Sequence, residues 1–228
     1  GLNSPFTGET LGGVRAASDL ELQWIGRPGP RYHADRQVRK PAPLCVAGRL
    51  FAQGQERIIA IDAYNGTPLW SLELPGLERY DIPHDASNWT ADEHFLYVAL
   101  ADHCWQLDAA SGHLARRLPV LTGGHEEKSY DWGYISSQGA YLLGSANIRG
   151  ANLKGWWGGG NWYDQETNTL AASDRLFAYE KESGEAAWSY EGAVIVNASI
   201  VCDESRVYFV ESRDEETVAN YGGRIYLT

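Results

Sequence analysis

Short runs of apolar residues, separated by clusters of glycine, asparagine, aspartate and serine, recur along the whole chain. The runs are rich in valine, isoleucine and aromatic residues, and no stretch keeps a helical period of hydrophobic positions, so each run predicts a β-strand. Four runs make up one unit: the first precedes a polar turn, the third ends at an acidic residue, and the fourth often ends in tryptophan. The pattern therefore predicts an all-β chain of four-stranded units.

One segment between the third and fourth runs is used three times. Its copies are AIDAYNGTPLW (60–70), QLDAASGHLAR (106–116) and AYEKESGEAAW (178–188). In each copy an acidic residue is followed four positions later by glycine, giving the pairs Asp62 and Gly66, Asp108 and Gly112, and Glu180 and Gly184. A carboxylate can accept turn amides and glycine tolerates a positive φ, so we assign these residues a structural role. Trp70 and Trp188 are expected to pack between repeats.

The repeat period is 46 residues. This spacing separates Gly66 from Gly112, Leu50 from Leu96, and Leu96 from Leu142. A four-stranded unit of about 40 to 50 residues is the size of a β-propeller blade. We predict antiparallel blades at about 41–75, 86–120, 131–191 and 197–228. The last unit is expected to be truncated, since RIYLT (224–228) matches the third run RLFAY (175–179). We therefore expect a fragment or segment of a larger propeller, its open edges covered by the remaining blades or another chain.

An insertion at 144–174 interrupts the period between the second and third runs of the third unit. In a propeller, loops at this position lie on the same rim as the connections between blades. The predicted ligand-binding residues of this rim are Arg36, Lys40, His84, Asp85, Asn88, His125, Asp131, Trp132, Trp156, Trp157, Trp162 and Tyr163. The insertion is either a lid or stacking platform for a sugar, quinone or peptide, or a plug whose tryptophans pack internally.

Composition narrows the function classes. The formal charge of −11 argues against a nucleic-acid surface, and no apolar run reaches the roughly 18 to 20 residues that span a bilayer. Cys45, Cys104 and Cys202 form no C-x-x-C pair and are expected to be small core residues. The sequence contains no metal-ligand spacing, nucleophile elbow or phosphate loop, so we predict no metal and no cofactor.

The pattern A-x-D-x-x-x-G-x-x-x-W, with AIDAYNGTPLW as its best copy, resembles the repeat of pyrroloquinoline-quinone-like (PQQ-like) propellers of the quinoprotein alcohol dehydrogenase-like superfamily. The strings LQWIGRPGPR and DASNWTADEHFLYVALADHCWQLDAASG look like bacterial PQQ-binding-like repeat proteins, so the resemblance covers nearly the whole chain. It implies a ring of about eight blades and a periplasmic or extracellular location. Dehydrogenases of this family typically hold the quinone between a tryptophan and two adjacent cysteines, with Ca²⁺ nearby, and this sequence has no adjacent cysteines.

Two function classes stay open. The first is an extracytoplasmic binding or scaffold module with a small-molecule or glycan ligand, or a protein partner, on the loop rim. The alternative is a quinone-dependent oxidoreductase, or a segment of one, which would use PQQ with Ca²⁺. The absent cysteine pair and the absence of a nucleophile or metal motif favour the binding module.

Overall fold

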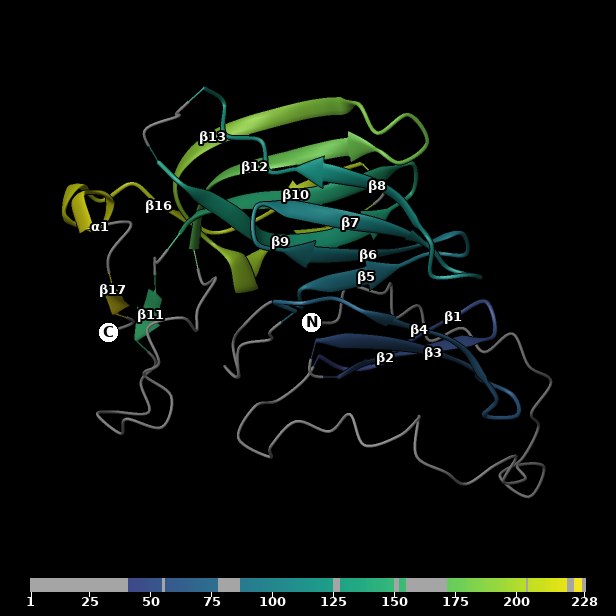
Figure 1. Cartoon of the computed structure of the whole chain (residues 1–228). Helices are drawn as coiled ribbons and strands as arrows, with labels where there is room; N and C mark the ends of the chain where they lie inside the picture. The colour runs from purple at the N-terminus through teal and green to yellow at the C-terminus, as the bar shows by residue number, and fades with distance from the viewer. Residues whose placement is uncertain are drawn as a thin grey trace, which may run out of the picture.

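The computed structural model describes residues 41–54, 56–77, 87–124, 128–149, 152–154, 172–203, 205–220 and 224–226. Within these residues, three antiparallel sheets of four or five strands follow one another along the chain as blades (Figure 1). Blade 1 contains β1 (Leu44–Val46), β2 (Arg49–Gly54), β3 (Arg57–Asp62) and β4 (Pro68–Glu73). Blade 2 contains β5 (Trp89–Ala91), β6 (Phe95–Leu100), β7 (His103–Asp108) and β8 (Leu114–Pro119). Blade 3 contains β9 (Tyr130–Gln138), β10 (Tyr141–Ile148), β12 (Ala172–Glu180) and β13 (Ala186–Val196).

Blades 1 and 2 are meanders in which neighbouring strands of the sheet are also neighbours in sequence, and blade 3 keeps this order except that β11 lies in sequence between β10 and β12. The residues of one strand alternate between the two faces of its sheet, and inner strands such as β3 and β6 are buried on both faces. On β6, Leu96 and Val98 join the apolar cluster shared with blade 1, whereas Tyr97 and Ala99 join the cluster shared with blade 3. Burial on both faces explains the near-continuous apolar runs, and the fold is confirmed as part of a β-propeller.

The turn from the third to the fourth strand has the same backbone geometry in all three blades. The glycine N–H donates to the carbonyl of the acidic residue, over 2.9 Å from Gly66 to Asp62 and 2.8 Å from Gly112 to Asp108. Gly184 donates to Glu180 in the same way, over 2.8 Å. The three glycines have φ between +73° and +76°, in the left-handed region that favours glycine.

The acidic side chains of these turns differ in what they bind. Asp62 Oδ1 accepts the amides of Tyr64 and Asn65, over 2.8 and 3.0 Å. Asp108 Oδ1 accepts the Ala110 and Ser111 amides and the Ser111 hydroxyl. The longer Glu180 side chain accepts the Ser183 hydroxyl over 2.7 Å. The repeated backbone turn therefore needs the glycine at one position, and tolerates either acid at the other.

The residues after β13 depart from the repeat. A 3₁₀ turn (Asn197–Ser199) leads into the hairpin of β14 (Val201–Cys202) and β15 (Val207–Tyr208). Next, β16 (Glu211–Ser212) pairs with β13, and helix α1 (Glu215–Asn220) follows. The sequence predicted no helix, because six residues are too few to display a helical period.

The last described strand, β17 (Arg224–Tyr226), is a strand as expected, but its pairing differs from the prediction. It runs parallel to β11 (Asn152–Lys154), which belongs to the insertion, instead of forming the third strand of a fourth blade. The match between RIYLT and RLFAY specifies a strand without specifying its partner, because register depends on what else is available to pair.

The three cysteines do not share one environment. Cys104 is fully buried between blades 2 and 3, where burial raises the pKa of its thiol well above the ordinary value. Cys202 is half-buried, with Sγ 3.6 Å from the Ser136 hydroxyl, and Cys45 is exposed. The prediction of three core residues is therefore wrong for Cys45, which occupies the short first strand of blade 1, where alternation turns it outward. No helix among the described residues is long and apolar enough to cross a membrane.

Candidate functional site

The rim predicted from the sequence is only partly within the described residues. Nine of its residues lie outside them: Arg36, Lys40, His84, Asp85, His125, Trp156, Trp157, Trp162 and Tyr163. The structure places the other three, Asn88, Asp131 and Trp132, where the first strands of blades 2 and 3 begin. At this end, the second and third strands of blade 3 also meet the insertion, so these residues share the rim.

Trp132, predicted as a ligand-binding residue of the rim, packs in the hydrophobic core between blades 2 and 3. Its side chain is 1% exposed and packs edge-on to Phe177, with ring centroids 4.8 Å apart, and in a stacked orientation on Tyr179 at 6.2 Å. Gly144 makes room for the ring, since a Cβ there would lie 2.6 Å from the Phe177 ring. Sequence position alone could not separate Trp132 from a loop residue, because the strand extends further toward the rim than the repeat predicted.

Asn88 is buried, at 9% exposure, and neither polar atom of its amide has a hydrogen-bond partner among the residues that the structure describes. Its backbone carbonyl accepts the Ala99 amide over 2.8 Å and so continues the pairing of β5 with β6. Asn147, near the end of β10, is 1% exposed, and within the described part of the chain both its amide atoms also lack partners. A buried amide without partners costs about 1–3 kcal/mol, so both residues call for an explanation.

Asn147 continues a row of polar side chains, which we call the polar wall: Ser145, Asn147, Ser173 and Asn197. All four are at most 1% exposed. Ser173 Oγ lies 2.7 Å from both Ser145 Oγ and Asn197 Oδ1, so the hydroxyls of Ser145 and Ser173 and the Asn197 carbonyl oxygen form one hydrogen-bonded cluster. Gly133 leaves space for this network, because a Cβ at that position would lie 2.6 Å from Ser145 Oγ. The wall is therefore satisfied internally except at Asn147.

Asp131 lies opposite Asn147 in the pairing of β9 with β10 and forms an ion pair at the rim. Arg149 Nη2 and Nε donate to Asp131 Oδ1 over 2.7 and 3.1 Å. This hydrogen bonding to Asp131 raises the pKa of the Arg149 guanidinium. On blade 2, His103 Nδ1 lies 2.8 Å from Asp102 Oδ1, and this hydrogen bond lowers the pKa of the Asp102 carboxyl. The rim charges are thus largely paired.

Asp174, at the base of the insertion on β12, is bound by Tyr130, whose hydroxyl donates to Oδ2 over 2.8 Å. Its other oxygen, Oδ1, is buried and has no hydrogen-bond partner among the described residues. Burial raises the pKa of the Asp174 carboxyl, although the Tyr130 hydrogen bond opposes that shift. The neighbouring Arg175 is 3% exposed, and its guanidinium lies against Gly123 and 3.7 Å from Glu191 Oε2.

Chemically, this rim offers neutral amide donors and acceptors beside paired charges. Among the described residues, no group of three His, Cys, Asp or Glu side chains could hold a metal ion. The sequence missed Asn147, Arg149 and Asp174, which it placed inside or beside the insertion. One signal was available for Asn147: it follows Leu143 and Ser145 on alternate positions, so the face of β10 becomes polar toward the rim.

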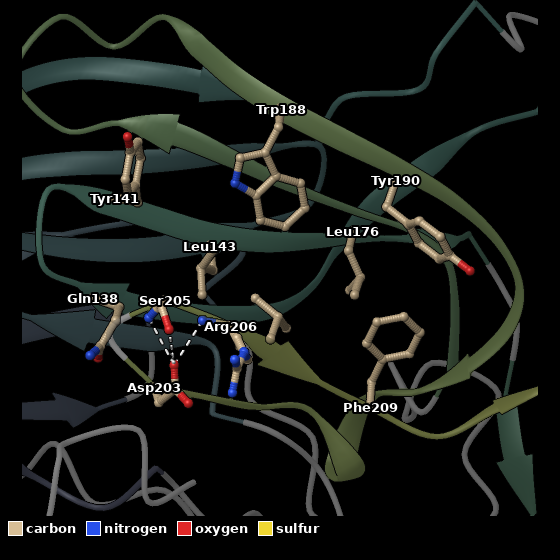
Figure 2. Close-up of a pocket in the computed structure, with 11 residues that line it drawn as sticks. Gln138, Tyr141, Leu143, Leu176, Trp188, Tyr190, Asp203, Ser205, Arg206 and Phe209 are labelled. Carbon is tan, nitrogen blue, oxygen red and sulfur yellow. Dashed lines mark hydrogen bonds between the residues drawn. The ribbon is translucent and has the colours of Figure 1, made fainter.

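A separate cavity of about 380 Å³ lies between blade 3 and the β14–β15 hairpin (Figure 2). Its walls are mainly aromatic and aliphatic, and none of the predicted rim residues lines it. The residues around it are Gln138, Tyr141, Leu143, Leu176, Trp188, Tyr190, Asp203, Ser205, Arg206, Val207 and Phe209.

No protein-family model and no curated protein matches the chain. Among solved structures, it is similar to quinohemoprotein alcohol dehydrogenase from Comamonas testosteroni, with 17% identity over 79% of this chain and 24% of that chain, and a TM-score of 0.45. A europium-containing methanol dehydrogenase matches with 14% identity over 67% and 32% of the two chains, and a TM-score of 0.44. BamB from Moraxella catarrhalis matches with 11% identity over 75% and 63%, and a TM-score of 0.35. The chain spans less than two thirds of each of these proteins, and such distant likeness assigns it no activity.

Proposed function

We propose that the chain is an extracytoplasmic binding module built of PQQ-like propeller repeats, which takes a neutral, hydroxyl-rich ligand such as a glycan on the loop rim. The observation that carries this proposal is the Asn147 amide, which is buried at the end of the polar wall and for which the described residues provide no hydrogen-bond partner to either atom. A residue that lowers stability in the free protein is best explained by a ligand or water that completes its hydrogen bonds.

The chemistry of the rim supports a neutral ligand. An asparagine amide supplies two donors and an acceptor, which matches hydroxyl groups, and Asn88 offers a second such amide. Asp131 and Arg149 already neutralise each other, so they provide no free charge for an anionic ligand. The assignment to PQQ-like repeats is supported by the three equivalent turns that begin at Asp62, Asp108 and Glu180.

The decisive experiment replaces Asn147 by leucine, which has a similar size and no polar atoms. In Asn147→Leu we expect the free energy of unfolding to rise by about 1–3 kcal/mol, because the uncompensated burial of the amide is removed. The same variant should lose binding to any glycan that the wild type captures on a neutral-glycan array, measured afterwards by calorimetry. A fall in stability would show that the amide serves the fold and would overturn the proposal.

Gln106 provides the control, because its buried amide nitrogen has a partner outside the rim, although its Oε1 has none among the described residues. Its Nε2 donates to the Lys181 carbonyl over 3.2 Å, between blades 2 and 3. Gln106→Leu should therefore lose stability and keep glycan binding, which is the opposite outcome on both readouts. Gain of stability in both variants would indicate that any leucine stabilises this core, and would remove the argument for a ligand.

Two further measurements test the rest of the proposal. Calorimetric titration with PQQ, with and without Ca²⁺, should show no tight binding, since two adjacent cysteines are absent and the chain carries a charge of −11. Stoichiometric sub-micromolar binding would replace the binding module by the quinone oxidoreductase. Cell fractionation of the product of the full open reading frame tests the location, and recovery in the cytoplasm would contradict it.

A further inference from the structure

The residue before the turn glycine differs between the blades. Blades 2 and 3 have serine there, Ser111 and Ser183, whereas blade 1 has Asn65, which forms the only Asn–Gly pair of the 228-residue sequence. In all three blades the side-chain oxygen at this position accepts the backbone amide two residues later. The distances are 2.8 Å to Asn65 Oδ1, 3.3 Å to Ser111 Oγ and 3.1 Å to Ser183 Oγ. The turn therefore uses a side-chain acceptor here, which serine and asparagine both provide.

Asparagine differs from serine because its side chain carries a carbonyl carbon that a nucleophile can attack. The Thr67 amide closes a turn on Asn65 Oδ1, and the hydrogen-bonded ring of this turn contains both Asn65 Cγ and the Gly66 nitrogen. The ring keeps these two atoms near each other, as in other pre-organised intramolecular reactions. The Thr67 amide also donates to the oxygen on which negative charge develops when the Gly66 nitrogen attacks Cγ. The geometry thus favours ring closure at this asparagine.

The surroundings of Asn65 leave the reaction open to water and free of steric obstruction. Gly66 has no Cβ to hinder the attacking nitrogen, and it lies at φ +76°. Asn65 is exposed, and its neighbour Tyr64 is 72% exposed, so water reaches the turn. Asn88 and Asn197, by contrast, are buried, and each precedes a residue with a side chain. Among these asparagines, Asn65 is therefore the reactive one.

The turn acid, Asp62, restrains the attacking nitrogen. The Gly66 N–H donates to the Asp62 carbonyl over 2.9 Å, so the nitrogen must give up this hydrogen bond before it loses its proton. The Asp62 carboxylate keeps the turn closed, because its Oδ1 accepts the amides of Tyr64 and Asn65 over 2.8 and 3.0 Å. Opening of the turn at the Asp62 end releases the nucleophile, while the Thr67 amide still holds Asn65 Oδ1. The frequency of this opening therefore sets the rate of attack.

We propose that Asn65 is a site of spontaneous covalent modification, at which the side-chain amide is converted into a mixture of aspartate and isoaspartate. The Gly66 nitrogen loses its proton to water and forms a bond to Asn65 Cγ, and the bond from Cγ to Nδ2 breaks. Nδ2 takes up a proton and leaves as ammonia, so the product is a cyclic succinimide. Water then opens the ring: attack at Cγ gives aspartate, and attack at the backbone carbonyl carbon gives isoaspartate. The reaction needs only water, and it is independent of the rim and its proposed ligand.

The two products affect the turn differently. Both replace a neutral amide by a negative charge close to the Asp62 carboxylate. Isoaspartate also adds one carbon atom to the main chain between Asp62 and Gly66, because the chain then continues through Cγ. The Gly66 N–H therefore no longer meets the Asp62 carbonyl in the register that all three blades share. The turns of blades 2 and 3 escape this change, since Ser111 and Ser183 have no amide to lose.

The experiment follows the folded 228-residue chain during incubation at pH 8 in ¹⁸O-labelled water. Peptide mapping by mass spectrometry measures the conversion of each asparagine, and an isoaspartyl methyltransferase detects isoaspartate. We expect Asn65 to react faster than every other asparagine, with more isoaspartate than aspartate, and to react more slowly at pH 6. Asn65→Ser, which introduces the residue of the other two blades, should abolish the signal and keep the melting temperature. Reaction at Asn65 only after unfolding in guanidinium chloride would show that the turn protects this residue, and would overturn the proposal.

A pair of variants tests the role of the turn acid. Asp62→Ala removes the acceptor of the Tyr64 and Asn65 amides and should speed the conversion about fivefold, the factor by which loss of a capping carboxylate shifts an opening equilibrium. Asp108→Ala removes the equivalent carboxylate of blade 2 and should leave the rate at Asn65 unchanged. An unchanged rate in Asp62→Ala, or equal acceleration in Asp108→Ala, would overturn the control of the reaction by the turn acid.

The structural effect of isoaspartate is measured on the modified protein, which anion exchange separates from the unmodified chain by its added charge. Asn65→Asp is the matched control, because it carries the same charge without the extra main-chain carbon. We expect the isoaspartate form to melt about 2–4 °C below Asn65→Asp, as a modest loss of stability gives in a chain of this size. Equal melting temperatures would show that the turn accommodates the added carbon, and would overturn the proposed effect on the turn.

Discussion

The two ends of each blade differ in how completely their polar groups are satisfied. At the turn end, Asp62 and Asp108 accept backbone amides, and the turn is repeated in three blades with nearly identical distances. At the rim end, the buried amides of Asn88 and Asn147 have no hydrogen-bond partners in the part of the chain that the structure describes. The comparison indicates that the turn end serves stability, whereas the rim end retains groups that lower it, as binding sites often do.

The largest effect on stability is expected at Trp132, just beneath the rim, and it tests how deep the binding surface reaches. Trp132→Ala should lower the free energy of unfolding by about 3–5 kcal/mol, because the ring packs between Phe177 and Tyr179 and its removal leaves a cavity. Denaturant unfolding measures this change. If Trp132→Ala left stability unchanged and removed ligand binding instead, the rim site would reach deeper than the comparison allows.

The turn end is tested with a pair of glycines. Gly112→Ala and Gly48→Ala both place alanine at φ +73°, which costs about 1–2 kcal/mol in each case. Gly112 also lies beneath Trp70, whereas a Cβ at Gly48 would meet nothing within 4 Å. Gly112→Ala should therefore lose a further 1–3 kcal/mol or so through overpacking. Equal losses in the two variants, measured by urea unfolding, would show that Trp70 moves aside freely.

A smaller effect is expected for the acid of the same turn. Asp108→Ala should cost about 1 kcal/mol, as the loss of a capping carboxylate does, because the amides of Ala110 and Ser111 lose their acceptor. Hydrogen bonds from Ser111 hold the pKa of Asp108 below its ordinary value. The contribution is therefore present above the unfolded pKa and is lost as the pH falls through the folded pKa. Thermal melts of both proteins between pH 7 and 3 should converge at the acidic end.

The smallest effect is expected at Asp174, where burial raises the pKa of the carboxyl. Asp174→Asn keeps an acceptor for Tyr130 and removes a charge, so at pH 7 it should stabilise the chain by about 0.5 kcal/mol. Because the folded-state pKa is raised, the difference in stability between the two proteins disappears as the pH falls and the wild-type carboxyl becomes protonated. A loss of stability in Asp174→Asn at pH 7 would show that the charge has a favourable partner at the rim.

The repeat was readable from the sequence because its determinants are local. Glycine at a positive φ and an acid four residues earlier define each turn without help from distant parts of the chain, so the amino-acid pattern alone was enough to assign Gly66, Gly112 and Gly184. The alternation of apolar residues on β6 likewise followed from strand geometry.

The site was less predictable because it depends on contacts between distant segments. Trp132 was expected at the surface, yet its burial depends on Phe177, which lies 45 positions further along the chain. The burial of the Asn147 amide could not be predicted from the sequence, because asparagine is common in loops and its burial depends on its neighbours in the fold. The sequence did not predict that Arg116 donates to the turn of the next blade as Trp70 does. The two side chains share a flat shape and an N–H donor but differ in hydrophobicity.

The pairing of β16 with β13 affects the solubility of the chain. A free sheet edge can recruit strands from other molecules, and β4 and β8, the outer strands of blades 1 and 2, contain residues that discourage this: Pro68 in β4, and Arg116, Arg117 and Pro119 in β8. The longer β13 contains neither proline nor a basic residue. Instead, Ser212 and Glu211 of β16 pair with Val194 and Ile195, so the most apolar stretch of that edge is already occupied. Mutations that detach β16 would therefore expose a template for aggregation while leaving the three blades intact.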